Sequence, residues 1–277
     1  MKRALRHAVS DLSYRVIRLT NGTHPGLRAL TYHRVTDAHP EDRLCVPVAM
    51  FAQQMRSLHG QGYQTVALEQ AATWIAGEAT LPPRAIVLTF DDGFEDNFVH
   101  AYPELARYGF TACFFVPSAF IESGPQAHRP KDRPMTWEQL RELLRHGQAI
   151  GAHSVTHRKL TLLDETPMRW EVQHCKDVLE RSLNHPVESF CYPAGNYNAS
   201  VRDAVRAAGY RVACTVRPGA NRPGTDVWAF KRTEISGDDS LWDFQKKLAG
   251  AYDLQHAALQ ALQWLQPVRE CQNAVVP

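Results

Sequence analysis

Two short motifs carry side chains that could bind a catalytic metal ion. Asp91 and Asp92 directly follow an apolar run, and so do His153 and His157 further along the chain. One carboxylate and two imidazoles make a three-ligand set that leaves a coordination position open for water, as a hydrolytic metal requires. Each motif alone has an ordinary interpretation, as a turn or as unrelated surface histidines. Because both follow strand-like runs, together they predict a metal site.

The two adjacent aspartates can divide the work. If Asp92 binds the metal, the cation neutralises part of its charge, so Asp91 can stay ionised beside it at lower electrostatic cost. Asp91 could then take the proton of the attacking water as a general base. Gly93 permits a tight turn with a positive φ and lets the backbone or a substrate approach closely.

Short apolar runs that alternate with helical patterns must position these side chains. Strands are predicted near residues 29–33, 85–90, 111–116, 149–153, 188–193, 211–216 and 228–235, and helices over 51–59, 137–145 and 168–183. This alternation is typical of parallel β/α folds, and 277 residues is a length that α/β barrels reach as one domain. We therefore expect an α/β fold, a distorted (β/α)7-type barrel of a single domain, with the site at the C-terminal ends of its strands.

The chain resembles the polysaccharide deacetylases, also called the NodB-homology or carbohydrate esterase family 4 proteins. The matching motifs are Thr89-Phe90-Asp91-Asp92-Gly93, His153-Ser154-Val155-Thr156-His157 and Phe190-Cys191-Tyr192-Pro193-Ala194-Gly195. Thr31-Tyr32-His33 looks like the N-terminal Tyr-His motif of the members that act on exopolysaccharides, and the resemblance extends from about Leu30 to about Gly250. It implies removal of an N-acetyl group from an amino sugar in a polysaccharide or a saccharide precursor. The implied metal is Zn2+, with Co2+ and Ni2+ as alternatives.

The resemblance also implies a role for each motif residue. The metal ligands would be Asp92, His153 and His157, with Asp91 as the general base. His33 would protonate the leaving amine, and the backbone N–H of Ala194 would stabilise the oxyanion. Substrate contacts are predicted for Tyr192, Pro193, Trp137 and Arg232.

Two positions depart from the family pattern. Many members have an Arg two residues before the proline of the third motif, where it braces the catalytic Asp, but Cys191 stands there in this chain. An Arg contact to Asp91 would have to come from elsewhere, and Arg232 is a candidate. Many members also take the general acid from a His near the C-terminal end. His256 matches that motif in letters, but its neighbours are typical of a terminal helix, so the acid is assigned to His33, for which the alternative is a partly buried residue at a strand end.

The charge balance indicates which partners to expect, and the cysteine spacing indicates whether the thiols are paired. Lys plus Arg number 31 and Asp plus Glu number 29, so the net charge of +2 gives no reason to expect nucleic acid. The expected partner is an N-acetylated saccharide. The six cysteines show no Cys-x-x-Cys spacing and are predicted to be reduced core residues.

The sequence divides into residues 1–25, an amphipathic segment; residues 26–250, the catalytic domain; and residues 251–277, a helical tail. The N-terminus lacks the apolar stretch of a secretory signal, so we expect a cytoplasmic protein. The basic N-terminal segment would either pack on the domain or lie on an anionic membrane surface, which would make the protein membrane-peripheral. Residues 125–134 are expected to form an exposed loop near the mouth of the site.

Three functions stay open. The first is a metal-dependent N-deacetylase. The second is a deformylase or an O-deacetylase acting on a lipid-linked or small saccharide, although an acid for a leaving amine favours amide cleavage. The third is a carbohydrate-binding pseudoenzyme, against which the intact pairs of aspartates and histidines argue.

Overall fold

The computed structural model describes residues 10–11, 13–15, 26–124, 126 and 132–253. Its centre is a curled, entirely parallel sheet. The strands run in the order β10 (Thr233–Glu234), β1 (Arg28–Tyr32), β5 (Ala85–Phe90), β6 (Cys113–Val116), β7 (Ala149–Ala152), β8 (Ser189–Cys191) and β9 (Val212–Cys214), and β4 (Gln64–Thr65) also pairs with β5. A separate parallel pair is formed by β2 (Arg34–Val35) and β3 (Cys45–Val46).

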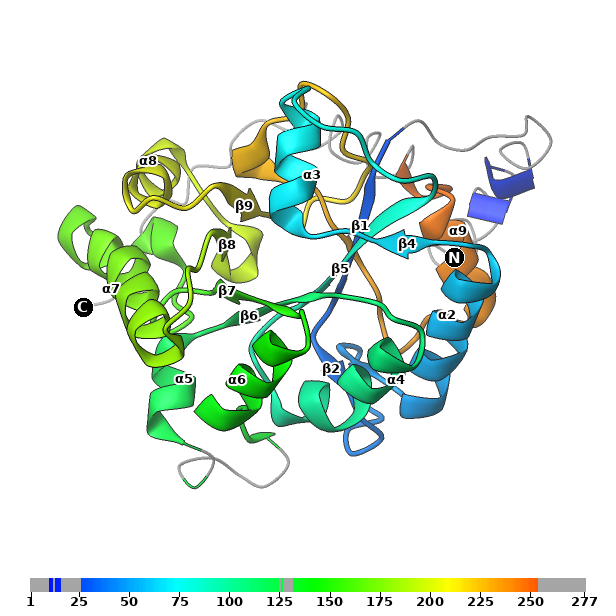
Figure 1. Cartoon of the computed structure of the whole chain (residues 1–277), viewed down its shortest axis with the longest axis horizontal. Helices are drawn as coiled ribbons and strands as arrows, with labels where there is room; N and C mark the ends of the chain where they lie inside the picture. The colour runs from blue at the N-terminus through cyan, green and yellow to red at the C-terminus, as the bar shows by residue number, and fades with distance from the viewer. Residues whose placement is uncertain (1–9, 12, 16–25, 125, 127–131, 254–277) are drawn as a thin grey trace, which may run out of the picture.

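Helices surround this sheet (Figure 1). They are α2 (Val48–Gly60), α3 (Leu68–Ile75), α4 (Tyr102–Arg107), α5 (Ser118–Ser123), α6 (Trp137–Arg145), α7 (Glu165–Leu183), α8 (Ala199–Ala207) and α9 (Leu241–Leu248). Most strand residues are fully buried, which explains why the strands are continuous apolar runs and do not alternate between polar and apolar residues. Parallel strands also bring their C-terminal ends to the same end of the barrel, where the loops that carry the motifs meet.

The segment of residues 230–235 links the two edges of the curled sheet. At one end the Phe230 N–H donates to the Ala213 carbonyl oxygen at 2.9 Å, next to β9. At the other end the Ile235 N–H donates to the Thr31 carbonyl oxygen, also at 2.9 Å, on β1. Arg232 lies in this segment and therefore inside the wall of the barrel.

The predicted fold class is confirmed, and each predicted strand is present. Most strands are shorter than predicted, and the last, predicted over 228–235, is reduced to β10 because the 3-10 turn η6 (Val227–Ala229) occupies its beginning. The helix predicted over 137–145 matches α6, and those predicted over 51–59 and 168–183 lie within α2 and α7. The five described cysteines are buried and free, as expected.

The described part of the N-terminal segment packs on α9. The rings of Tyr14 and Trp242 meet edge to face at 4.7 Å between centroids, and Lys246 Nζ donates to Ser10 Oγ at 3.2 Å. The remainder of residues 1–25, the tail beyond residue 253 and the predicted position of His256 lie outside the described residues. Within the described ranges, no helix combines the length and the apolar character needed to cross a bilayer.

Candidate active site

The aspartate motif forms a sharp turn directly after β5. The Asp91 N–H continues the sheet by donating to the Tyr32 carbonyl oxygen at 2.9 Å. Asp92 then adopts φ 71° and Gly93 φ 67°, so the chain turns away from the sheet. A Cβ atom at position 93 would lie 2.7 Å from a side-chain carbon of Val116, so only glycine fits.

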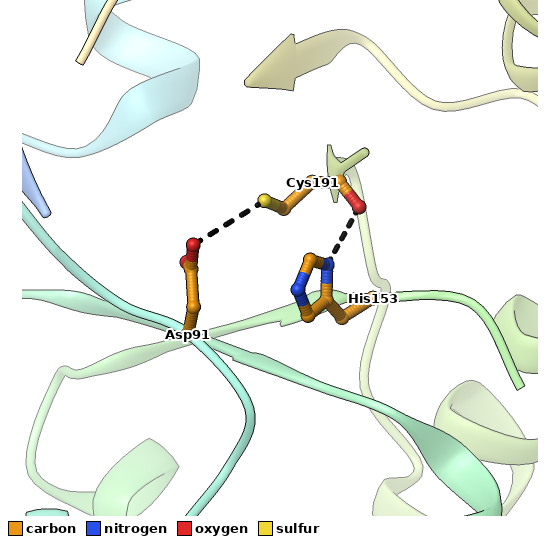
Figure 2. Close-up of side chains that lie close together, drawn as sticks. All are labelled: Asp91, His153 and Cys191. Carbon is orange, nitrogen blue, oxygen red and sulfur yellow. Dashed lines mark hydrogen bonds between the residues drawn. The ribbon is translucent and has the colours of Figure 1, made fainter. Parts of the chain in front are cut away.

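The histidine motif forms the corresponding turn after β7. His153 is buried, and its Nδ1 lies 2.7 Å from the Cys191 carbonyl oxygen (Figure 2). A carbonyl can only accept, so Nδ1 carries the proton and Nε2 of the neutral ring is left with a free lone pair. The His157 N–H donates to Ser154 Oγ at 3.0 Å, and both residues have a positive φ.

Three potential ligand atoms converge where these turns meet. Oδ1 of Asp92 lies 3.5 Å from Nε2 of His153 and 3.2 Å from Nε2 of His157. Neither contact has hydrogen-bond geometry, and the buried Oδ1 has no hydrogen-bond partner among the described residues. Burial opposes ionisation of Asp92, but the two imidazoles outweigh it and hold the pKa of this carboxyl well below its usual range. A buried oxygen facing two imidazole nitrogens fits a divalent cation such as zinc.

Asp91 is held by a buried arginine. Arg232 donates from Nη1 to Asp91 Oδ1 at 2.6 Å and from Nη2 to Oδ2 at 2.8 Å, and neither side chain is more than 3% exposed. Its Nη2 also contacts the Cys191 sulfur at 3.0 Å, while that thiol lies 3.6 Å from Asp91 Oδ2 (Figure 2). Burial would raise the pKa of Asp91, but the charge and hydrogen bonds of Arg232 outweigh burial and lower it. Asp91 is therefore a carboxylate, which is the form that can accept a proton.

The Arg contact to Asp91 that Cys191 cannot supply therefore comes from Arg232. Its guanidinium reaches Asp91 from the segment that links β9 to β1. The same position does not suit the predicted role of Arg232 in substrate binding, because the side chain is fully buried and its donors point to protein acceptors.

Glu171 is a residue that the sequence analysis did not identify. It lies on α7, is 3% exposed, and its Oε2 accepts from the backbone N–H groups of Val155 and Thr156, each at 2.9 Å. Its Oε1 accepts from the Thr156 hydroxyl. This carboxylate therefore fastens the loop that carries His157. A sequence signal was present, because Glu171 falls on the face of α7 that is otherwise occupied by Met168, Val172 and Cys175.

His33 directly follows β1 and is partly buried. Its carbonyl oxygen accepts from Asn97 Nδ2 at 3.0 Å, at the start of the π-helix η1 (Asn97–Ala101). Its Nδ1 is buried and has no hydrogen-bond partner within the described part of the chain. The ring lies near both catalytic carboxylates, since a positive charge on it would lower the pKa of Asp91 and of Asp92.

The third motif forms the 3-10 turn η5 (Pro193–Gly195) after β8. Ala194 is exposed and has φ 54° and ψ 18°, and its N–H donates to no acceptor that the structure describes. Of the six non-glycine residues with positive φ in the described chain, four are Asp92, Ser154, His157 and Ala194. Backbone strain of this kind tends to gather at functional sites.

The other predicted substrate contacts lie at different depths. Tyr192 is fully buried and its hydroxyl donates to the Trp228 carbonyl oxygen at 3.1 Å, and Pro193 is also buried, so neither side chain faces a substrate. Trp137 is partly exposed at the start of α6. The Glu95 N–H donates to the Arg133 carbonyl oxygen at 2.9 Å, which brings the described end of the loop predicted over 125–134 beside the aspartate turn. Residues 125 and 127–131 of that loop lie outside the described residues.

Comparisons with known proteins identify the family of the chain. A family model described as polysaccharide deacetylase matches residues 78–213. YxkH of Bacillus subtilis (strain 168), a protein assigned to the polysaccharide deacetylases, is 30% identical over 210 residues, which cover 76% of this chain and 71% of YxkH. The poly-beta-1,6-N-acetyl-D-glucosamine N-deacetylase of Escherichia coli (strain K12) is 24% identical over 263 residues, which cover 81% of this chain but only 39% of that protein.

Solved structures share the fold. The deacetylase PplD of Streptococcus pyogenes, solved in complex with acetate, superimposes with a TM-score of 0.73 at 22% identity, covering 80% of this chain and 98% of PplD. IcaB from Ammonifex degensii gives a TM-score of 0.71 at 25% identity, covering 82% of this chain and 97% of IcaB. The chain therefore belongs to the polysaccharide deacetylase family.

Proposed function

We propose that the protein is a metal-dependent hydrolase that removes an N-acetyl group from an amino sugar of a saccharide. The observation that carries this proposal is the buried Oδ1 of Asp92, which has no hydrogen-bond partner among the described residues and faces the Nε2 atoms of His153 and His157. A second carboxylate, that of Asp91, lies beside it and is kept ionised by Arg232. A binding module would need neither the open ligand set nor the adjacent base.

In this proposal Asp92, His153 and His157 hold zinc. When bound, zinc supplies Lewis-acid activation of a water molecule and of the acetyl carbonyl. Asp91 accepts the proton of the attacking water, and its bidentate pairing with Arg232 fixes both carboxylate oxygens for that transfer. The His153 ring is held in one tautomer by the Cys191 carbonyl oxygen, so its Nε2 is directed at the site.

Two further groups complete the proposed reaction. The N–H of Ala194, for which the structure describes no acceptor, donates to the oxyanion that forms when water attacks the carbonyl. A protonated His33 gives its proton to the departing amine, which is otherwise a poor leaving group. Ala194 has a positive φ and is exposed in the turn that follows β8.

The relatives support the choice of acyl group and sugar. The Escherichia coli relative is named as an N-deacetylase of poly-beta-1,6-N-acetyl-D-glucosamine. We therefore propose an N-acetylated exopolysaccharide, or a precursor of one, as the substrate of this chain.

The test is acetate release by protein that has been stripped of metal and then reloaded with zinc. The substrates are N-acetylglucosamine oligomers, and Asp92→Ala is compared with the matched variant Asp203→Ala, whose carboxylate is exposed on α8. We expect zinc-dependent release by the parent and by Asp203→Ala, and none by Asp92→Ala. Release of formate or of O-linked acetate instead would transfer the proposal to a deformylase or an O-deacetylase. Absence of turnover on all three classes would support a binding function.

A further inference from the structure

Arg217 occupies a fixed position at the edge of the candidate active site. It follows β9, and its neighbour Val216 packs so closely on Gly195 that a Cβ atom there would lie 2.4 Å from a Val216 side-chain carbon. The Arg217 N–H donates to Thr215 Oγ1 at 3.1 Å, and its carbonyl oxygen accepts from the Arg232 N–H at 3.0 Å. The backbone of Arg217 is therefore tied both to the turn that carries the Ala194 N–H and to the arginine that holds Asp91.

The side chain of Arg217 lies against the ring of Tyr197, which is itself held by a second aromatic ring. Its guanidinium carbon lies 5.2 Å from the centre of the Tyr197 ring, within the range of a cation–π contact. Tyr197 in turn stacks on the fully buried Tyr192, with 4.7 Å between centroids and 17° between planes. This support restricts the guanidinium while leaving Arg217 exposed to solvent.

No carboxylate pairs with Arg217 in the part of the chain that the structure describes, although nearby arginines do have such partners. Arg202 pairs with Asp226 at 2.6 Å, and Arg211 pairs with Glu188 at 3.3 Å. A guanidinium has five N–H donors in a planar fork that matches a carboxylate or a phosphate. The donors of Arg217 are thus available to a ligand.

Two more cations lie next to a candidate metal ligand along the chain. Arg158 and Lys159 directly follow His157, both are exposed, and neither forms an ion pair with a described acidic residue. The two carboxylates of the site are committed elsewhere, since Asp91 pairs with Arg232 and Asp92 faces the histidines. Cations close to a site attract anions and raise their local concentration.

We propose that Arg217 binds an anionic group of the saccharide, either the carboxylate of a uronic acid or a phosphate, next to the acetylated sugar. This inference rests on the proposed function and deepens it, because it makes the substrate an acidic saccharide instead of a neutral N-acetylglucosamine polymer. A carboxylate would come from an acidic polymer, whereas a phosphate would come from a sugar phosphate precursor.

The test measures binding, so that it does not depend on turnover. Zinc-loaded parent protein is titrated by calorimetry with three probes: a neutral N-acetylglucosamine oligomer, an oligomer of alternating glucuronate and N-acetylglucosamine, and N-acetylglucosamine 1-phosphate. Arg217→Gln is compared with Arg211→Gln, which removes an exposed arginine at the other end of β9. The ratio of anionic to neutral affinity cancels contributions that both probes share.

We expect the parent and Arg211→Gln to bind one of the anionic probes more tightly than the neutral oligomer. In Arg217→Gln this preference should fall on the order of tenfold, the effect of one charge-assisted hydrogen-bonded contact. Preference for the glucuronate oligomer would identify a polymer, and preference for the sugar phosphate a precursor. Equal binding of neutral and anionic probes by the parent, or an unchanged preference in Arg217→Gln, would overturn the inference. Acetate release from all three probes is measured separately, and failure on every probe would count against the proposed function without bearing on anion binding by Arg217.

Discussion

Replacing Arg232 by Met should destabilise the protein strongly at neutral pH, and the size of the effect can be worked out from the structure. Arg232 is fully buried and donates two short hydrogen bonds to Asp91, which is itself 2% exposed. Methionine fills much of the volume but leaves Asp91 buried without a counter-charge. Removal of one partner of a buried ion pair typically costs about 3–5 kcal/mol.

The cost of leaving Asp91 as a buried, unpaired charge cannot exceed the free energy of protonating it, because the carboxyl can take up a proton and become neutral. Protonating a carboxyl with an ordinary pKa of about 3.9 costs about 1.4 kcal/mol for each pH unit above that value. The limit is therefore about 4 kcal/mol at pH 7 and about 1.5 kcal/mol at pH 5. Loss of the other donor contacts of Arg232, to Thr89 and Thr215, adds to this cost at both pH values.

The sign of the pH dependence follows from the direction of the pKa shift. In the parent the pKa of Asp91 is lowered by Arg232, so its ionised form adds stability above the unfolded pKa, and that stability is lost as the pH falls through the folded pKa. In Arg232→Met burial is no longer opposed by the guanidinium, which is the largest of the lowering causes, and we expect it to raise the pKa of Asp91 above the unfolded value. The loss of folding stability in Arg232→Met is then largest at neutral pH, and it becomes smaller as the pH falls through the raised pKa of Asp91.

The assay is urea unfolding of metal-free protein at pH 7 and pH 5, with Asp91→Asn, Arg232→Met and the double variant. Arg211→Met serves as the control, because its pair with Glu188 is exposed and worth at most about 1 kcal/mol. We expect the loss in Arg232→Met to be smaller at pH 5 and the double variant to be more stable than the sum of the single losses predicts. A loss below about 1 kcal/mol at pH 7, or strict additivity, would refute the reasoning.

Three further outcomes are expected. Glu171→Gln removes an acceptor that holds the loop of the second histidine, so zinc affinity measured against a chromophoric chelator should fall about 10–100-fold; an unchanged affinity would contradict this positioning role. Gly195→Ala puts an alanine where the backbone has a positive φ and places its Cβ against a neighbouring valine, so it should lower the free energy of unfolding in urea by about 1–3 kcal/mol. Gly60→Ala, whose Cβ would meet no atom within 4 Å, should not destabilise the protein. Burial raises the pKa of the Cys175 and Cys214 thiols to about 12, so they should react with a thiol reagent at pH 8 only after unfolding; rapid labelling of native protein would show that they are accessible.

Much of the fold followed from local patterns. The strand-like runs and their helical intervals predicted the parallel barrel because parallel strands buried on both faces are continuous apolar runs. The length of the last strand was overestimated because the turn over Val227–Ala229 is fixed by contacts of Asp226, whose side chain accepts from the Trp228 N–H, and not by apolar periodicity.

The sequence by itself determined which residues form the candidate ligand set. Asp92 and His153 lie within two residues of the ends of buried strands, and His157 is four residues further along the same loop. Parallel strands bring their C-terminal ends to the same end of the sheet. Proximity then follows from order along the chain, without knowledge of side-chain packing.

Only the tertiary structure decided which groups support that set. Arg232 and Asp91 are 141 residues apart and meet because residues 230–235 link the two edges of the sheet, a closure that no local pattern encodes. Likewise, the burial of Tyr192, the anchoring of the histidine loop by Glu171 and the placement of Arg217 beside the Ala194 turn depend on how loops from different strands pack together. Spacing in a sequence specifies which side chains leave the same end of a strand, whereas contacts between distant segments are set by the packing of the whole barrel.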